Sequence, residues 1–352
     1  MIQDEHIEAA VAQGIITADQ ARRLRALAEG SLLREDLSAD PDDERFRLIG
    51  GFNDVFVTIG VGLLVAALFA LASVLEFGIG FAALAMVAAW GLSEVFSRRM
   101  RLALPSIALA IMFAGAGSFM GVYMGGVLVT LSDRLTSLVD ARAALETAPA
   151  LFAGLGAAAA ALVHERRFHV PVDWAIAAVG LTYAIAHTVS QVVPGFNSAV
   201  LFAALGACIF VAALRVDASD RARQTRRSDI AFWLHLVAAP MIVHGGIQLL
   251  VGSPDGMGTG QALAVLAIFG LLGLVAIVID RRALLISGLT YAGVAMGYLI
   301  SQGVQRDMGV SLTLLGLAVV VLGLSAGWRS LRRAILPLLP LGSLRHSIPP
   351  PA

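Results

Sequence analysis

Long apolar stretches alternate with short charged segments along most of this chain. An α-helix rises 1.5 Å per residue, so about 17 to 25 apolar residues cross the roughly 30 Å hydrocarbon core of a bilayer. The pattern predicts an all-α, polytopic transmembrane bundle of about ten helices. The predicted spans cover approximately residues 52–75, 78–96, 102–126, 147–164, 171–190, 198–214, 230–252, 260–279, 283–302 and 308–328.

Composition supports a membrane protein and argues against other classes. The 352 residues are 58% hydrophobic and 14% charged, whereas about a quarter of the residues in a soluble domain are charged. The formal net charge is zero and there is no basic stripe, so we expect the lipid bilayer as a partner and not nucleic acid. Cys208 is the only cysteine, which excludes an intrachain disulfide and a thiolate metal site.

The basic residues predict an orientation for the spans. All 25 are arginine, and arginine accumulates in short cytoplasmic loops. Ten spans with cytoplasmic N- and C-termini place 22 of the 25 arginines inside and leave only Arg134, Arg142 and Arg306 outside. The alanine-rich span at 147–164 is the weakest, but omitting it would invert the later spans. A composition rich in arginine, alanine and glycine is typical of GC-rich bacteria, so we expect the bacterial inner membrane.

The chain divides into three parts by composition. Residues 1–47 carry eleven acidic residues and six arginines and predict a cytoplasmic helical hairpin with its linker. Residues 48–336 contain the ten spans, and residues 337–352 form a proline-rich cytoplasmic tail. Within the leader, "GIITADQARRL" predicts a helix start, because Thr17 and Gln20 have the spacing of a capping box.

The segment "AVAQGIITADQARRLRALAEG" resembles the short helical hairpins that flank many bacterial membrane proteins. Together with the multispan block that follows, the chain is similar to bacterial "predicted membrane protein" families of unknown function that begin with such a hairpin. The resemblance covers about the first fifty residues and the general layout beyond. It implies no catalytic residues. The hairpin either packs on the membrane block or docks a cytoplasmic protein partner.

One pentapeptide occurs twice. "GLTYA" stands at residues 180–184 in the fifth span and again at 288–292 in the ninth. Parallel copies four spans apart favour duplication of a four-helix unit, whereas two inverted five-helix halves are one layout used by ten-span transporters. Both interpretations, and chance, remain open at this point.

The seventh span contains an unusual group of polar residues. His235 lies just beneath the predicted membrane interface, while His244 lies nine residues further, about 13 Å along the axis. Gln248 follows His244 at i+4 and shares its face. Pro240 lies between the two histidines, removes one backbone hydrogen bond and favours a bend. A buried imidazole is either a proton or substrate group, since its charge changes near neutral pH, or a hydrogen-bonded packing group.

Two other spans supply polar residues that are possible partners for this group. The fifth has Tyr183 and His187 at i,i+4, and the ninth has Tyr291. His187 is predicted nearer the outer surface than His244, which argues against a bis-histidine haem site, and we expect no cofactor or metal. Nearer the cytoplasmic side, Asp54 and Glu94 either reach the interface or pair with each other.

Glycine in the third span has a simpler interpretation. Gly117, Gly121 and Gly125 follow the GxxxGxxxG spacing that gives a helix a smooth face for close packing. The sequence does not say whether the partner helix belongs to the same chain.

Enzyme signatures are missing from the sequence. It contains no GxSxG, HExxH, Walker or dinucleotide-binding motif, and we expect no enzymatic activity. His164 and His169 are assigned to a cytoplasmic loop whose charges set the topology. The leading hypothesis is a protein that binds or transports a small solute or ion without covalent chemistry. The alternative is a membrane scaffold or regulatory protein whose N-terminal hairpin docks a cytoplasmic partner.

Overall fold

The computed structural model describes residues 4–17, 20–21, 52–75, 78–135, 147–193, 195–220, 225–250, 258–340 and 342. The chain divides into two compact units, one of residues 1–45 with 351–352 and one of residues 46–350.

The N-terminal unit begins with helix α1 (Asp4–Ala12). A turn follows, in which Gly14 has a φ of +70°. Both hydrogen bonds of the predicted capping box are present: the Thr17 N–H donates to Gln20 Oε1 at 2.8 Å, and the Gln20 N–H donates to Thr17 Oγ1 at 3.2 Å. Beyond Gln20 and Ala21, the second helix of the predicted hairpin lies outside the described residues.

The second unit contains ten helices long and apolar enough to cross a membrane, among the described residues. These are α3 (Phe52–Leu75), α4 (Gly78–Ser93), α5 (Ala103–Leu135), α7 (Ala148–Phe168), α8 (Val172–Val192), α9 (Ser198–Ala218), α10 (Arg226–Leu250), α11 (Thr259–Ile279), α12 (Ala283–Ser301) and α13 (Arg306–Ile335). Helix α4 continues into a π-helix, η1 (Glu94–Arg99), and α13 into a 3₁₀ turn, η2 (Leu336–Leu338). The prediction of an all-helical fold with ten spans is confirmed, which indicates a multi-pass membrane protein.

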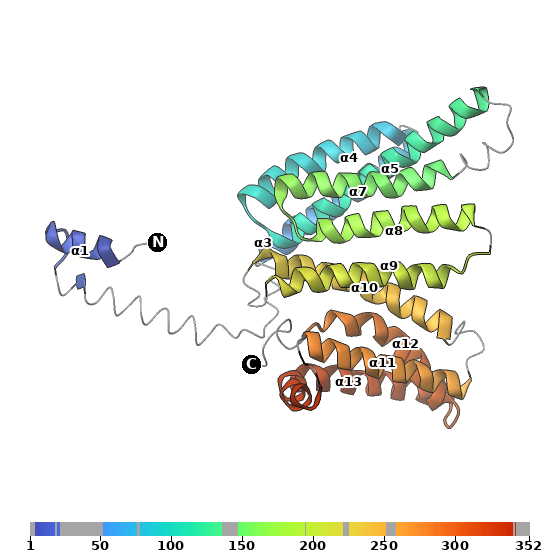
Figure 1. Cartoon of the computed structure of the whole chain (residues 1–352). Helices are drawn as coiled ribbons and strands as arrows, with labels where there is room; N and C mark the ends of the chain where they lie inside the picture. The colour runs from blue at the N-terminus through green and yellow to red at the C-terminus, as the bar shows by residue number, and fades with distance from the viewer. Residues whose placement is uncertain are drawn as a thin grey trace. The chain divides into compact units, whose positions relative to one another are not determined.

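Helices that are consecutive in sequence lie side by side for most of this unit (Figure 1). Helix α10 packs against α8 and α9 on one side and against α12 on the other, so it joins the earlier helices to the later ones. The outermost helices, α3 and α13, are the least buried. Their apolar surfaces are those expected of helices that face lipid.

The four connections α4–α5, α7–α8, α9–α10 and α11–α12 lie at the same end of the unit (Figure 1). We call it the charged end, because most of the arginines outside the leader lie there. Three of these connections contain a non-glycine residue in the left-handed region: Arg101 with φ 54°, His169 with φ 57° and Asp280 with φ 57°. The left-handed conformation reverses the chain within a few residues, which keeps adjacent helices in contact up to their ends.

Close helix contacts depend on glycine. A Cβ atom on Gly121 of α5 would lie 1.9 Å from the Phe152 carbonyl oxygen of α7, and Gly117 and Gly125 also face α7 at less than 3 Å. The partner of the predicted glycine stripe is therefore a helix of the same chain. Such small residues let two backbones approach within a membrane, where van der Waals packing is a main source of helix association.

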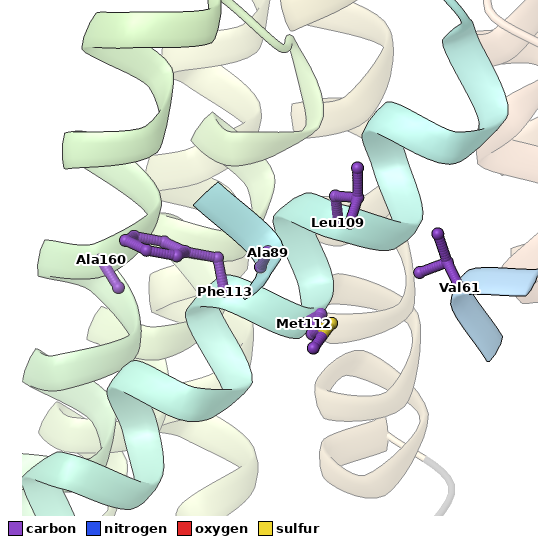
Figure 2. Packing of buried hydrophobic residues seen from close by; sticks show 6 residues of the cluster. All are labelled: Val61, Ala89, Leu109, Met112, Phe113 and Ala160. Carbon is purple, nitrogen blue, oxygen red and sulfur yellow. The ribbon is translucent and has the colours of Figure 1, made fainter. Parts of the chain in front are cut away.

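An apolar cluster joins α3, α4, α5 and α7 (Figure 2). Its buried members are Val61, Ala89, Leu109, Met112, Phe113 and Ala160. The Phe113 side chain extends from α5 toward α7 (Figure 2). Its ring lies 5.6 Å, centroid to centroid, from the ring of His164. The apolar core thus borders directly on a polar group at the charged end.

Candidate functional site

Polar side chains from successive helices meet at the charged end. We call this set the polar belt. Its members are Ser93, Glu94, His164, Glu165, Arg167, Asp173, Asp217, Arg226, Ser228, His235, Asp280, Arg281, Trp328 and Arg332. Among the described helices from α4 to α13, every helix except α5 carries a residue of the polar belt or has such a residue next to one of its ends.

The first part of the belt is a chain of three side chains from three helices. His164 Nδ1 lies 2.8 Å from Asp173 Oδ2, and His164 Nε2 lies 3.1 Å from Ser93 Oγ. All three residues have 0% exposed surface. Around the imidazole lie the rings of Phe113 and Phe168. The sequence interpretation placed His164 in a loop as a topology determinant. That was wrong, because the last turn of α7 extends to Phe168 and carries His164 into the core.

Three ion pairs flank this group. Arg167 Nε donates to Glu94 at 2.8 Å, and Arg98 contacts the other carboxylate oxygen at 3.0 Å. Glu165 is paired with Arg226 at the start of α10. Two arginines hold Glu94, while the alternative of an Asp54–Glu94 pair stays a prediction.

The central part of the belt lies where α9, α10 and the α11–α12 connection meet. Arg281 donates from Nε and Nη2 to the two carboxylate oxygens of Asp217 at 3.1 and 2.5 Å. Its Nη2 also reaches the Ser228 hydroxyl at 3.2 Å. His235, fully buried, has Nε2 3.9 Å from Asp217 and its ring against Phe210. His235 thus belongs to this group and lies apart from His244.

The last part of the belt secures α13. The Trp328 indole N–H donates to Asp280 Oδ1 at 2.7 Å. Arg332 lies 3.6 Å from the other carboxylate oxygen and donates from Nε to the Ile277 carbonyl at 3.2 Å. Asp280, Trp328 and Arg332 are all buried. The cations of the belt are arginines, whose planar guanidinium suits two-point contact with a carboxylate.

These contacts explain how charged residues remain buried in an apolar chain. An unpaired buried charge is very costly, whereas a paired and hydrogen-bonded one is tolerated. Because the ion pairs other than Arg98–Glu94 join different helices, the belt ties α4 to α7, α7 to α10, α9 to the α11–α12 connection and that connection to α13. Sequence reasoning missed Ser93, Asp173, Asp217, Asp280 and Arg332. One sequence signal could have indicated the acidic members. Each lies near the first or last turn of a span, and arginines lie at the ends of other spans.

His244 meets a partner that the sequence proposed, but in a different setting. Its Nδ1 is hydrogen-bonded to the Tyr291 hydroxyl of α12. The sequence analysis treated His244 as a buried imidazole, which is wrong because His244 is exposed on the helix surface. The cavity described below is lined by neither His244 nor Gln248. Helix α10 is continuous through Pro240, and the predicted bend there stays a prediction.

A cavity of about 590 Å³ lies between α8, α9 and α10, away from the charged end. Its walls are mainly apolar and include Leu201, Leu236 and Met241. The polar side chains that line it are Thr182, Tyr183, His187, Ser190 and Ser198. Pockets of 300–1,000 Å³ with apolar walls and few polar groups are typical of small-molecule sites.

Tyr183 and His187 share one face of α8 in this cavity, with ring centroids 6.2 Å apart and planes inclined by 20°. Among the described residues, neither the Tyr183 hydroxyl nor the His187 imidazole has a hydrogen-bond partner. The two "GLTYA" copies thus differ: Tyr183 faces a cavity, while Tyr291 binds His244. In both copies the glycine, Gly180 or Gly288, faces the preceding helix.

Comparison of the chain with models of protein families, with curated proteins and with solved structures gave no match. The resemblance of the leader to bacterial membrane-protein hairpins stays a prediction, and function has to be argued from the two polar regions.

Proposed function

We propose that this chain is a bacterial inner-membrane protein that binds a small, mostly apolar molecule with a polar end in the cavity between α8, α9 and α10. The interaction is non-covalent. The observation that carries the proposal is the pair Tyr183 and His187, two hydrogen-bonding groups that face an apolar cavity without a partner among the described residues. In a membrane, such groups need a ligand, water or another helix to satisfy them.

The arginine distribution supports cytoplasmic termini, and with that orientation the cavity would lie toward the outer half of the membrane. Its lining residues come from the second half of α8, from the beginning of α9 with the preceding Phe196, and from the middle of α10. Tyr183 is 51% exposed and Phe196 is 42% exposed, so the cavity has an opening beside them. A ligand with an apolar body and a hydrogen-bonding end would place the body against Leu201, Leu236 and Met241 and the end against Tyr183 and His187.

Cysteine reactivity tests whether the cavity is accessible. In a Cys208→Ala background, Thr182→Cys places a thiol in the cavity, while Leu181→Cys places one on the adjacent exposed face of α8. In proteoliposomes or nanodiscs we expect a small water-soluble methanethiosulfonate to modify Thr182→Cys much faster than Leu181→Cys. Equal, negligible reactivity at both positions would contradict the proposal and favour a sealed scaffold.

Protection by a defined probe tests binding. We expect 1-decanol, which has an apolar chain and one hydroxyl, to slow the modification of Thr182→Cys. Adding Tyr183→Phe or His187→Ala should weaken this protection about two- to tenfold, the equivalent of one hydrogen bond. Protection that is identical in all three proteins would show that these two side chains do not hold the polar end.

A further inference from the structure

The imidazole of His164 is buried and is held at both nitrogens. Asp173 Oδ2 lies 2.8 Å from Nδ1 and Ser93 Oγ lies 3.1 Å from Nε2. A serine hydroxyl can rotate to donate or to accept, whereas an ionised carboxylate only accepts. The geometry therefore accommodates the ring both as neutral imidazole, with its N–H directed to Asp173, and as imidazolium, with N–H groups directed to both partners.

The Asp173 carboxyl has a further acceptor position. Its Oδ1 is buried and has no hydrogen-bond partner among the described residues. A buried carboxylate oxygen without a donor costs free energy. A proton on this oxygen neutralises the buried negative charge, so the His164–Asp173 pair has more than one place to hold a proton.

The glutamates around this pair are held by arginine. Helix α5 places the Phe113 ring beside His164. The other adjoining elements carry Glu94, Arg98 and Arg99 in η1, Glu165, Arg166 and Arg167 in α7, and Arg226, Arg227, Asp229 and the buried His235 in α10. Each glutamate is paired with arginine, and arginine keeps its proton throughout the physiological range. His164 and Asp173 differ from these glutamates, because they are hydrogen-bonded to each other and neither has an arginine partner among the described residues.

The pair also joins two helices, one of which forms a wall of the cavity. His164 belongs to α7, whereas Asp173 lies in the first turn of α8, whose second half carries Tyr183 and His187. Asp173 and His187 lie about 21 Å apart along that helix. Between them, α7 and α8 touch through bare backbone, because a Cβ on Gly180 would lie 2.6 Å from the Gly154 carbonyl oxygen. A smooth contact of this kind allows small sliding movements of packed helices.

We propose that Ser93, His164 and Asp173 form a proton-binding site, and that proton loading shifts α8 against α7 and reshapes the cavity. The coupling rests on the proposed function, while the proton site itself does not. A proton added to or removed from the His164–Asp173 pair alters the attraction between α7 and α8. Since α8 is continuous from Asp173 to the cavity, the movement is transmitted along its axis.

A fluorescent reporter on α8 tests the proposal. In the Cys208→Ala background, Ser190→Cys is labelled with bimane, and its emission is recorded from pH 5 to pH 8 in nanodiscs. We expect a sigmoidal change that disappears in His164→Gln and in Asp173→Asn. The change should persist in His169→Asn, the matched control. His169 is an exposed residue in the α7–α8 connection, and asparagine tolerates its left-handed backbone conformation. The change should also persist in His187→Gln, which removes the imidazole nearest the label in sequence.

Other outcomes overturn the proposal. The proposal is contradicted if the pH response survives in His164→Gln or vanishes in His187→Gln. It is also contradicted if the parent protein shows no pH response. If the His164 and Asp173 variants do not fold, Ser93→Ala decides: removing one hydrogen bond should move the midpoint by about 0.5–1 pH unit, and an unchanged midpoint contradicts the assignment. The accessibility of Thr182→Cys is measured separately, so a reactive cavity without a pH response rejects only the proton site.

Discussion

The polar belt and the cavity are built on the same helices but treat polar groups in opposite ways. Helix α8 contributes Asp173 to the belt and His187 to the cavity, and α10 contributes Ser228 to the belt and Met241 to the cavity. In the belt, carboxylates meet guanidinium groups, imidazole or indole on other helices. In the cavity, Tyr183 and His187 meet apolar walls. The difference separates polar groups that hold the fold together from polar groups that are available to a ligand.

Energetics give this difference a measurable form. Removing one member of a buried ion pair leaves its partner charged and unpaired, which costs far more than the pair itself contributes. Removing a group that has no partner leaves nothing unsatisfied behind. Substitutions in the belt should therefore lower stability, and substitutions in the cavity should alter binding at nearly constant stability.

The largest effect is expected for Arg281→Met. It leaves the buried Asp217 carboxylate without its guanidinium, so the free energy of unfolding should fall by about 3–5 kcal/mol. The neighbouring Arg282, which lies over the Trp328 ring at 5.1 Å, is the matched control, and Arg282→Met should cost about 0.5–1 kcal/mol. Equilibrium unfolding in mixed micelles measures both. Equal losses would mean that the belt does not stabilise the bundle through Asp217.

Much of the fold follows from the sequence, because the length of an apolar stretch is a direct physical requirement for crossing a bilayer. The ten predicted spans agree with helices α3 to α13 even where alanine makes the signal weak, as in α7. The belt could not be predicted in this way. Nearly all the arginines fitted the rule for cytoplasmic loops, and that explanation concealed the few, such as Arg281 and Arg332, whose side chains turn back into the core. Which arginine meets which carboxylate depends on helix rotation and neighbour order, and periodicity alone specifies neither.

The candidate residues of the seventh span also show that the sequence does not specify how a helix is rotated in the bundle. Tyr291 was proposed as a partner of His244, since the two lie at similar depths on spans seven and nine, and the structure brings them together. Depth can be estimated from residue number. Residue number does not show whether the pair faces lipid, a cavity or the core. In the structure His244 is exposed, while Tyr291 is partly buried and packs against an apolar cluster.

An intermediate effect is expected for Tyr291→Phe, which sharpens the comparison because this pair is hydrogen-bonded but not fully buried. Loss of the contact with His244 should lower the free energy of unfolding by about 0.6 kcal/mol, the average for hydrogen bonds between membrane helices. Tyr298→Phe, on the same helix, is the control. A loss of 3 kcal/mol or more, roughly that of a broken buried ion pair, would place His244 and Tyr291 with the belt.

The smallest effect on stability is expected for His187→Leu. The imidazole has no hydrogen-bond partner among the described residues and faces apolar walls, so the free energy of unfolding should change by less than about 0.5 kcal/mol or rise slightly. His164→Leu is the contrasting substitution, as it removes the link between Ser93 and Asp173. A large destabilisation by His187→Leu, measured by the same unfolding method, would remove the distinction between the two regions.

The π-helical turn at the end of α4 has a consequence for insertions and deletions during evolution. Deleting one residue from a membrane-spanning α-helix normally rotates all later side chains by about 100°, which moves them away from the helices they pack against. A π-helical turn holds one residue more per hydrogen-bonded ring than an α-helical turn. A single deletion within Glu94–Arg99 can therefore be absorbed by conversion of that turn to α-helix. Ser93 and everything before it would keep their register, so length variants at this point should retain the fold while those in the middle of α4 lose it.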